Sequence, residues 1–285
     1  MRPQPNGTEV LILRPVRMYV NYYQQFDADF SLEYPAEGYG GWKKAELEFD
    51  LDRTALVVMH AWDCGTKEEY PGWFRCVDYI PRSYDICERV LPPIMEAARS
   101  SGMTLYHVVR PNSEYYKSYA GYRRAVALAG TAAPRPAPIG PAPELDRLHK
   151  FRRDHVFPGA HNVSDISRGQ PHIDFPEPVK PKGDEGVAES SEQLFALCKA
   201  DGICHLIYTG FAINGCLVSS PGGMVDMQRR GLLCSAIRQA VTAIENKETV
   251  RHETAKEIAL WQVALLYGFV IDDADFVRSV AASRR

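Results

Sequence analysis

The sequence predicts an α/β fold built on a mostly parallel sheet. Continuous apolar runs at residues 55–59 and 206–208 are typical of strands that are covered on both faces, and residues 103–109 predict a further buried strand. Segments with helical apolar spacing lie between these runs, and several of them end at a glycine. Strands that alternate with helices imply right-handed crossovers, with helices on both faces of the sheet.

The first 50 residues differ from the rest and are expected to form an N-terminal extension. Residues 9–23 alternate loosely between apolar and polar side chains, which predicts a strand or a hairpin. Residues 30–50 are rich in aromatic residues and glycine and suggest an ordered arm. We expect residues 1–50 to pack on the core or on a second subunit, and residues 51–285 to form the main domain.

The domain is expected to begin with a buried strand at 55–59. A helix follows at 83–101, interrupted by Pro92 and Pro93 and closed by Gly102, and a second strand spans 103–109. Residues 111–181 then break the rhythm, and their proline-rich run at 130–146 predicts an exposed loop. A long insertion of this kind usually serves as a lid, an oligomer contact or a mobile loop.

Regular alternation resumes after the insertion. The pattern predicts a helix at 190–202 capped by Ser190 or Ser191, a strand at 203–210, and a helix that follows Cys216 and ends at Gly231. A strand at 232–237 and a long amphipathic helix at 253–267 come next, and residues 269–277 close the domain. Sites in such sheets lie at the carboxyl ends of the strands, so residues that follow the strands at His60 and Gly210 are expected to meet there.

Composition narrows the possible functions. A net charge of −3 and the lack of a basic cluster argue against nucleic-acid binding, and no apolar run is long enough to span a membrane. The N-terminus lacks the apolar core of a signal peptide. The 7 cysteines are scattered and odd in number, which favours reduced thiols in a cytoplasm over a disulfide framework. No zinc-binding spacing occurs, and we expect neither a metal nor a cofactor.

Cys216 is the strongest functional candidate. It follows a buried strand and a turn that Gly210 permits, and Asn214 is positioned to cap the helix that comes next. Cys216 would then lie about two residues into that helix, where unpaired N–H groups favour a thiolate. The alternative is that Cys216, like most free cysteines, packs as a small hydrophobic residue.

Two stretches carry a family resemblance. Residues 202–220, GICHLIYTGFAINGCLVSS, fit the pattern GIxxLxxxGFAxNxCL, and residues 238–276 are similar to a closing strand, loop and helix. Together they resemble the isochorismatase-like family of cysteine hydrolases, over about residues 54–277 without the insertion. The resemblance implies a three-layer α/β/α sandwich and hydrolysis of a small amide or ureido C–N bond. It also implies a thioester on Cys216, an oxyanion hole of backbone N–H groups, and a cis peptide between Ala212 and Ile213.

The family triad is cysteine, lysine and aspartate, and the aspartate aligns here with His60. His60 can act as the general base in a Cys–His dyad. Asp63 can orient His60 or replace the aspartate from the loop. Alternatively, His60 ends a buried strand and bonds a backbone carbonyl.

The lysine position is ambiguous. Counting back from Leu194 reaches Lys182, whereas counting forward from the turn at 183–184 reaches Ala188 or Glu189. Lys182 is therefore either the family lysine or a solvated loop residue. Arg238 follows a predicted strand and can bind a substrate carboxylate through paired hydrogen bonds.

The expected ligand is a small-molecule substrate, and the resemblance implies a homo-oligomer, a dimer or a tetramer. A second hypothesis is a non-catalytic family member that acts in binding or assembly. A third, hydrolysis of a vinyl ether, needs no thiol and is less consistent with Cys216.

Overall fold

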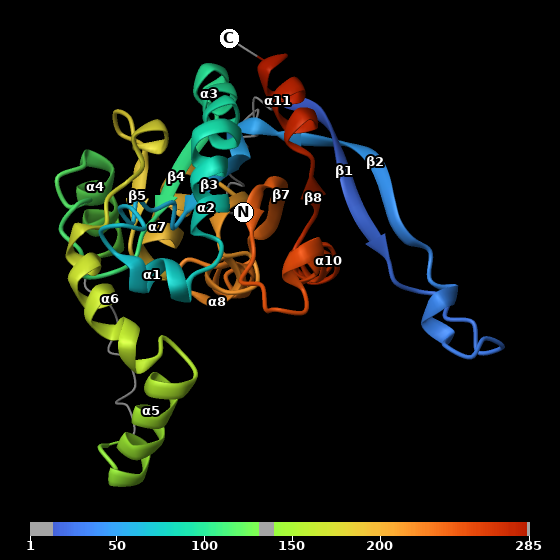
Figure 1. Cartoon of the computed structure of the whole chain (residues 1–285). Coiled ribbons are helices and arrows are strands. Elements are labelled where there is room, and N and C mark those ends of the chain that lie inside the picture. The colour runs from blue at the N-terminus through green and yellow to red at the C-terminus, as the bar shows by residue number, and fades with distance from the viewer. Residues whose placement is uncertain (1–13, 131–139, 284–285) are drawn as a thin grey trace, which may run out of the picture.

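The computed structural model describes residues 14–130 and 140–283 and contains one eight-stranded sheet of order β2-β1-β8-β7-β6-β3-β4-β5 (Figure 1). Neighbouring strands from β8 to β5 run parallel, whereas β1 is antiparallel to both of its neighbours. The strands are β1 (Pro15–Gln24), β2 (Gly41–Asp50), β3 (Thr54–Met59), β4 (Thr104–Val108), β5 (Gly186–Ala188), β6 (His205–Phe211), β7 (Leu233–Thr242) and β8 (Val270–Ile271).

Helices cover both faces of the sheet. On one face lie α3 (Leu91–Ser101) and α11 (Asp273–Ala281), and on the other lie α4 (Ala120–Ala129), α7 (Ser191–Asp201), α9 (Met224–Arg229) and α10 (Thr254–Leu266). The remaining helices are α1 (Pro71–Cys76), α2 (Ile80–Asp85), α5 (Pro143–His155), α6 (Val163–Gly169) and α8 (Cys216–Ser219). This arrangement confirms the predicted three-layer α/β/α class. Within the described residues, none of these helices has the length and apolar character needed to cross a membrane.

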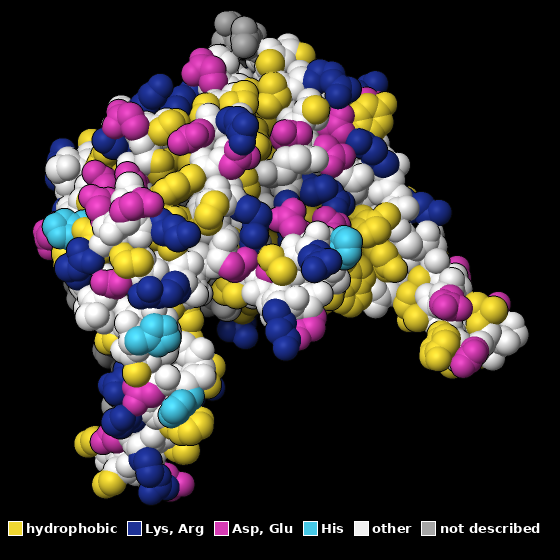
Figure 2. Space-filling model, viewed as in Figure 1, with side chains coloured by type: hydrophobic (Ala, Val, Ile, Leu, Met, Phe, Trp, Pro, Cys, Tyr) yellow, Lys and Arg dark blue, Asp and Glu magenta, His cyan; other side chains and the backbone are white. Residues whose placement is uncertain are grey.

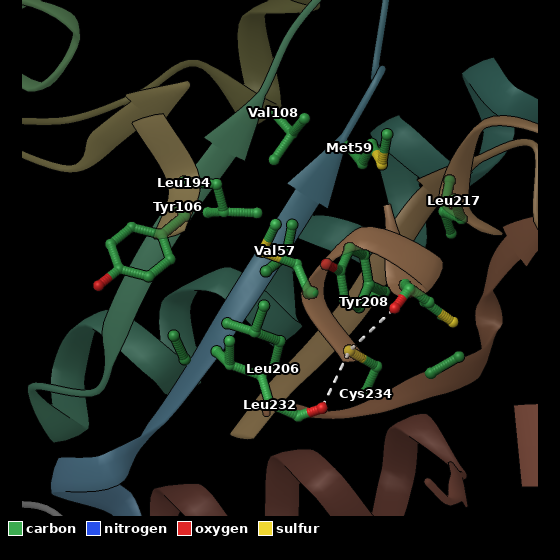
Figure 3. Packing of buried hydrophobic residues seen from close by; sticks show 14 of the residues in the cluster. Val57, Met59, Tyr106, Val108, Leu194, Leu206, Tyr208, Leu217, Leu232 and Cys234 are labelled. Atoms are coloured by element: carbon green, nitrogen blue, oxygen red, sulfur yellow. Dashed lines mark hydrogen bonds between the residues drawn. The ribbon is translucent and has the colours of Figure 1, made fainter. Parts of the chain in front are cut away.

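The central strand β3 explains why the strands read as continuous apolar runs. Its six residues are all buried. Val57 and Met59 belong to the apolar cluster beneath α7 and α10, whereas Leu56 and Val58 belong to the cluster beneath α3 and α11. Figure 3 shows Val57 and Met59 among their neighbours in the first cluster. Because successive side chains point to opposite faces, burial of both faces removes the polar alternation.

The N-terminal extension is a hairpin over residues 15–50, where the sequence predicted a strand or a hairpin at 9–23 and an ordered arm at 30–50; residues 1–13 lie outside the described residues. Strands β1 and β2 pair along their whole length, from Pro15 opposite Asp50 to Gln24 opposite Gly41. Asn21 of β1 pairs with Val270 of β8, which adds the hairpin to the edge of the sheet. The hairpin runs past the body of the domain, and its tip projects into solvent (Figure 1).

Three elements differ from expectation. The single helix expected after Cys216 is two short helices, α8 and α9, because the segment between them contains Pro221 and the left-handed Gly222 (φ +80°). The predicted helix at 83–101 contains a π-helical turn at Ile86–Val90 before α3, next to the two prolines. The insertion is partly helical: α5 begins inside the proline-rich run, with Pro143 in its first turn.

Candidate active site

Three parallel strands end at one cavity. His60 follows β3, Arg110 follows β4 and Cys216 follows β6. The cavity has a volume of about 240 Å³ and is lined by His60, Trp62, Val109, Arg110, Pro111, Cys216, Ser220 and Pro221. The structure therefore brings Cys216 and His60 together at the carboxyl edge of the sheet, where sites in parallel α/β folds lie.

At Gly210, shortly before the turn that carries Cys216, β6 packs closely against β3. Gly210 has a φ of +110°, and a Cβ at this position would lie 1.9 Å from the Met59 carbonyl oxygen. Only glycine can occupy such a position. The pairing of β6 with β7 shifts register between Tyr208 and Gly210, and a cis peptide follows at Phe211–Ala212. The cis bond lies one residue before the expected position.

Asn214 does not cap the helix, contrary to the sequence prediction. Its side chain makes two hydrogen bonds with the backbone of Ile244. Nδ2 donates to the Ile244 carbonyl oxygen at 2.8 Å, and Oδ1 accepts from the Ile244 N–H at 2.9 Å. Gly215 precedes α8, and Cys216 is its first residue. Asn214 therefore ties the cysteine turn to the loop after β7, and α8 is too short to supply a substantial dipole.

The predicted oxyanion residues are only partly available. The Ile213 N–H donates to the Thr242 carbonyl at 2.9 Å, and the Ala212 carbonyl accepts from the N–H groups of Gly215 and Leu217. Within the described residues, the Cys216 N–H has no acceptor. It is thus a backbone donor at this turn that remains free for a ligand.

His60 is buried and held in an unusual conformation. Its φ of +53° is left-handed, which costs about 1 kcal/mol for a non-glycine residue. Its N–H donates to the Val108 carbonyl at 2.9 Å, and its ring stacks on Trp62 with centroids 4.6 Å apart. Nδ1 is buried and unpaired within the described part of the chain. Burial, assisted by the Arg110 charge, lowers the pKa of His60 to about 4, so the ring is neutral at pH 7.

Asp63 and Lys182 lie elsewhere. The Asp63 side chain is exposed, and its Oδ1 accepts from the Gly65 N–H at 2.9 Å and from the Tyr84 hydroxyl at 3.2 Å. Lys182 is exposed and precedes β5, at the opposite edge of the sheet. Neither residue lines the cavity that holds Cys216.

Glu189 is the residue that follows β5 at the carboxyl edge, and one of the two sequence counts reached it. Its carboxylate accepts hydrogen bonds from Tyr116 and from Tyr122, the latter at 2.6 Å. These bonds outweigh burial and lower its pKa. A bound carboxylate therefore stands where one count predicted the lysine.

Arg238 also lies away from the cavity. Its guanidinium bonds Glu257 at 2.6 Å and packs over the Trp42 ring of the hairpin, 5.3 Å from the centroid. Sequence reasoning instead missed Arg110 and Trp62. Arg110 directly follows the strand predicted at 103–109, so the rule that selected His60 after the strand at 55–59 also selects Arg110. With its amide oxygen turned toward Arg110, Gln170 accepts from Nη2 at 3.1 Å.

A smaller apolar cavity of about 60 Å³ adjoins the first. It shares His60 and Trp62 with the larger cavity and is otherwise formed mainly by Trp73, Tyr79 and Phe211. The stacked pair of His60 and Trp62 thus lines both cavities. In the part of the chain that the structure describes, no three His, Cys, Asp or Glu side chains are grouped to hold a metal ion.

Comparisons with known proteins address the fold. No protein-family model matches the sequence, and no curated protein is similar enough to be called a relative. A cysteine hydrolase from Pseudomonas syringae pv. phaseolicola 1448A aligns with a TM-score of 0.51 at 15% identity, over 82% of this chain and 95% of that one. An isochorismatase-like hydrolase from Alkaliphilus metalliredigens aligns with a TM-score of 0.46 at 16% identity, over 79% of this chain and 98% of that one. The chain therefore shares its fold with the cysteine hydrolase from Pseudomonas syringae.

Proposed function

We propose that the protein hydrolyses a small amide or ureido C–N bond, with Cys216 as nucleophile and His60 as general base. The observation that carries this proposal is that both side chains line one cavity at the carboxyl edge of the sheet. A cysteine beside a neutral imidazole is a common arrangement for nucleophilic catalysis.

The reaction proceeds in two halves. The Cys216 sulfur attacks the substrate carbonyl carbon while its proton passes to the His60 imidazole. The C–N bond then breaks, the imidazolium returns the proton to the leaving nitrogen, and an acyl group remains on Cys216 as a thioester. A water molecule attacks the thioester and gives its proton to His60, which passes it to the departing thiolate.

The cavity also constrains the substrate. The Cys216 N–H is free to bond the oxyanion that forms during attack. Arg110 lines the same cavity and has no carboxylate partner within the described residues, so it favours a substrate that bears a negative charge. A volume of about 240 Å³ lies below the roughly 300–1,000 Å³ of sites for drug-sized ligands, which favours a small substrate.

The proposal is tested by trapping the thioester. The full chain is incubated with a panel of small amides and ureido acids, quenched in acid, and its intact mass is measured. We expect one acyl adduct on the wild type, mapped to Cys216 by peptide analysis, and none on Cys216→Ala. Turnover that persists in Cys216→Ala would contradict the proposal.

The alternative is a binding protein that kept the fold. The observation in its favour is that Asp63 and Lys182 do not line the cavity and Glu189 is bonded to two tyrosines. In that case panel compounds raise the melting temperature, but none forms an adduct or is hydrolysed.

A further inference from the structure

Two projections of this molecule expose large apolar side chains. One is the hairpin tip, defined here as residues 25–40, and the other is helix α5 with the residues that follow it. Figure 1 shows them leaving the body of the domain at well-separated places. Clustered exposed apolar residues on a soluble protein usually mark an interaction surface.

The hairpin tip combines aromatic and acidic side chains. Phe30 is 87% exposed and Tyr34 is 62% exposed, and Phe26 and Leu32 are also exposed. The tip contains no lysine or arginine. Its four carboxylates have no cationic partner in the described part of the chain; they are Asp27, Asp29, Glu33 and Glu37. The surface is therefore apolar with a net negative charge.

Helix α5 has the complementary composition. It has no buried residue, and its apolar side chains, Leu145, Leu148 and Phe151, recur every three positions on one face. The helix contains four cations and three acids; Asp154 pairs with Lys150 and Arg153, whereas Arg147 and Arg152 have no ion pair within the described residues. A solitary helix of about 12–15 residues is marginal in water, so this apolar face favours a partner.

Each projection is anchored to the body by contacts at its root, and the two lie apart within one chain. At the root of the tip, the Gln25 side chain accepts from the Trp261 indole at 3.0 Å, and the Tyr23 ring packs against Trp261. At the other projection, α5 leads into α6, where the Asp165 carboxylate accepts from the Gly72 N–H at 2.9 Å. Figure 2 shows the two projections as separate limbs with the body between them.

We propose that the acidic, aromatic hairpin tip of one copy binds the basic, apolar face of α5 on a second copy. In a two-fold dimer the same rotation places the second tip on the first α5, so the contact forms twice and no projection is left unpaired. The aromatic side chains supply buried area, and the opposite charges fix the pairing and speed association. The proposal does not depend on the activity proposed above.

The contact is tested first by site-specific crosslinking in the full chain. A photoreactive benzoylphenylalanine replaces Phe30, and a mixture of isotopically light and heavy protein is irradiated. We expect mixed-isotope crosslinks between the tip and residues 143–157. Crosslinks confined to one isotope, or located only on the body of the domain, would overturn the proposal.

Charge reversal supplies the second test, read by sedimentation. The tip variant carries Asp27→Lys, Asp29→Lys and Glu33→Lys, and the helix variant carries Arg147→Glu and Arg152→Glu. Because the altered side chains are solvent-exposed, both variants should keep their circular dichroism. We expect each alone to raise the dimer Kd at least about tenfold, and the combined variant to recover most of that loss.

The control is Lys67→Glu, an exposed charge change away from both projections. It should leave the Kd unchanged. A monomeric wild type, or a dimer that neither reversal weakens, would refute the proposed contact and point to a different interface.

Discussion

Polar side chains at the amino edge of the parallel sheet are paired with one another, whereas two at the carboxyl edge are buried without a partner within the described residues. At the amino edge, Arg99 bonds Glu185 through both oxygens, at 2.6 and 3.0 Å, and Arg124 is paired with Asp201. Burial would raise the pKa of Glu185, but hydrogen bonds from His107 and Arg99 outweigh it and lower the pKa to about 2. At the carboxyl edge, His60 Nδ1 and Trp62 Nε1 are buried and unpaired within the described residues.

This difference indicates that a ligand would bind at the carboxyl edge. An unpaired buried polar atom costs about 1–3 kcal/mol, so folded proteins retain few of them. The His60 and Trp62 rings are stacked on one another and line a cavity that Cys216 also lines, which fits a site that a ligand completes. His107 Nδ1 is also unpaired, but its other nitrogen is bonded to Glu185 and it lines no described cavity.

The cysteines follow the same division. Cys234 lies inside the apolar core, with only long contacts of 3.9 Å to two carbonyl oxygens (Figure 3). Burial raises its pKa to about 12, which makes it inert at neutral pH. Cys204 is exposed at the amino edge, and Cys216 lines the cavity at the carboxyl edge. These two thiols form a matched pair of accessible cysteines at opposite ends of β6.

The largest expected effect separates these two cysteines. Cys216→Ala should lower turnover of any hydrolysed amide or ureido compound by at least about a thousandfold, because it removes the nucleophile. Cys204→Ala should leave kcat/KM within about twofold. Steady-state kinetics on purified variants checks this, and an equal loss in both variants would contradict the assignment.

A second contrast concerns two left-handed glycines. Gly210→Ala would place a Cβ against the Met59 carbonyl oxygen and should lower the free energy of unfolding by roughly 3 kcal/mol or more. Gly102 has a φ of +70° with nothing within 4 Å, so Gly102→Ala should cost only about 1 kcal/mol of backbone strain. Urea unfolding measures both, and similar losses would refute the close approach of β6 to β3.

The buried histidines predict how stability depends on pH. Burial lowers the pKa of His60, with help from Arg110, and that of His205 to about 4, against 6.5 for an ordinary histidine. The folded state then binds fewer protons than the unfolded state. Stability is therefore complete above pH 6.5 and is lost as the pH falls toward 4, by about 3 kcal/mol for each residue.

His60→Asn tests this dependence, since asparagine tolerates the left-handed backbone. The slope of unfolding free energy against pH between 6.5 and 4 should fall in His60→Asn by about as much as in His205→Asn. His205→Asn provides the comparison at the amino end of β6. An unchanged slope in His60→Asn would show that His60 is protonated in the folded protein.

The smallest expected effects come from cations at the two edges. Lys182→Ala should leave kcat and KM unchanged, because the side chain is exposed at the amino edge. Arg110→Gln should raise KM about tenfold for an anionic substrate and little for a neutral one, since it removes a charge from the cavity. A strong loss of activity in Lys182→Ala would contradict this account and indicate that Lys182 is part of the site.

The fold was predictable from local patterns, whereas the site was predictable only in part. The continuous apolar run of β3 predicted the layers of the fold. The motif around Cys216 predicted the nucleophile candidate. The positions of Lys182 and Arg238 could not be predicted, because counting residues along a loop does not show at which edge of the sheet a side chain lies. The role of Asn214 depends on Ile244, which is distant in sequence. Arg110 was within reach, since it directly follows a predicted strand.

The most direct test is the pH dependence of alkylation, followed residue by residue with iodoacetamide and mass spectrometry. We expect Cys216 to react faster than exposed Cys204 at neutral pH and to lose that advantage in His60→Asn, whereas Cys234 stays unmodified. If Cys216 reacts no faster than Cys204, and His60→Asn changes neither rate, the pair is not a catalytic dyad and the cavity serves binding instead.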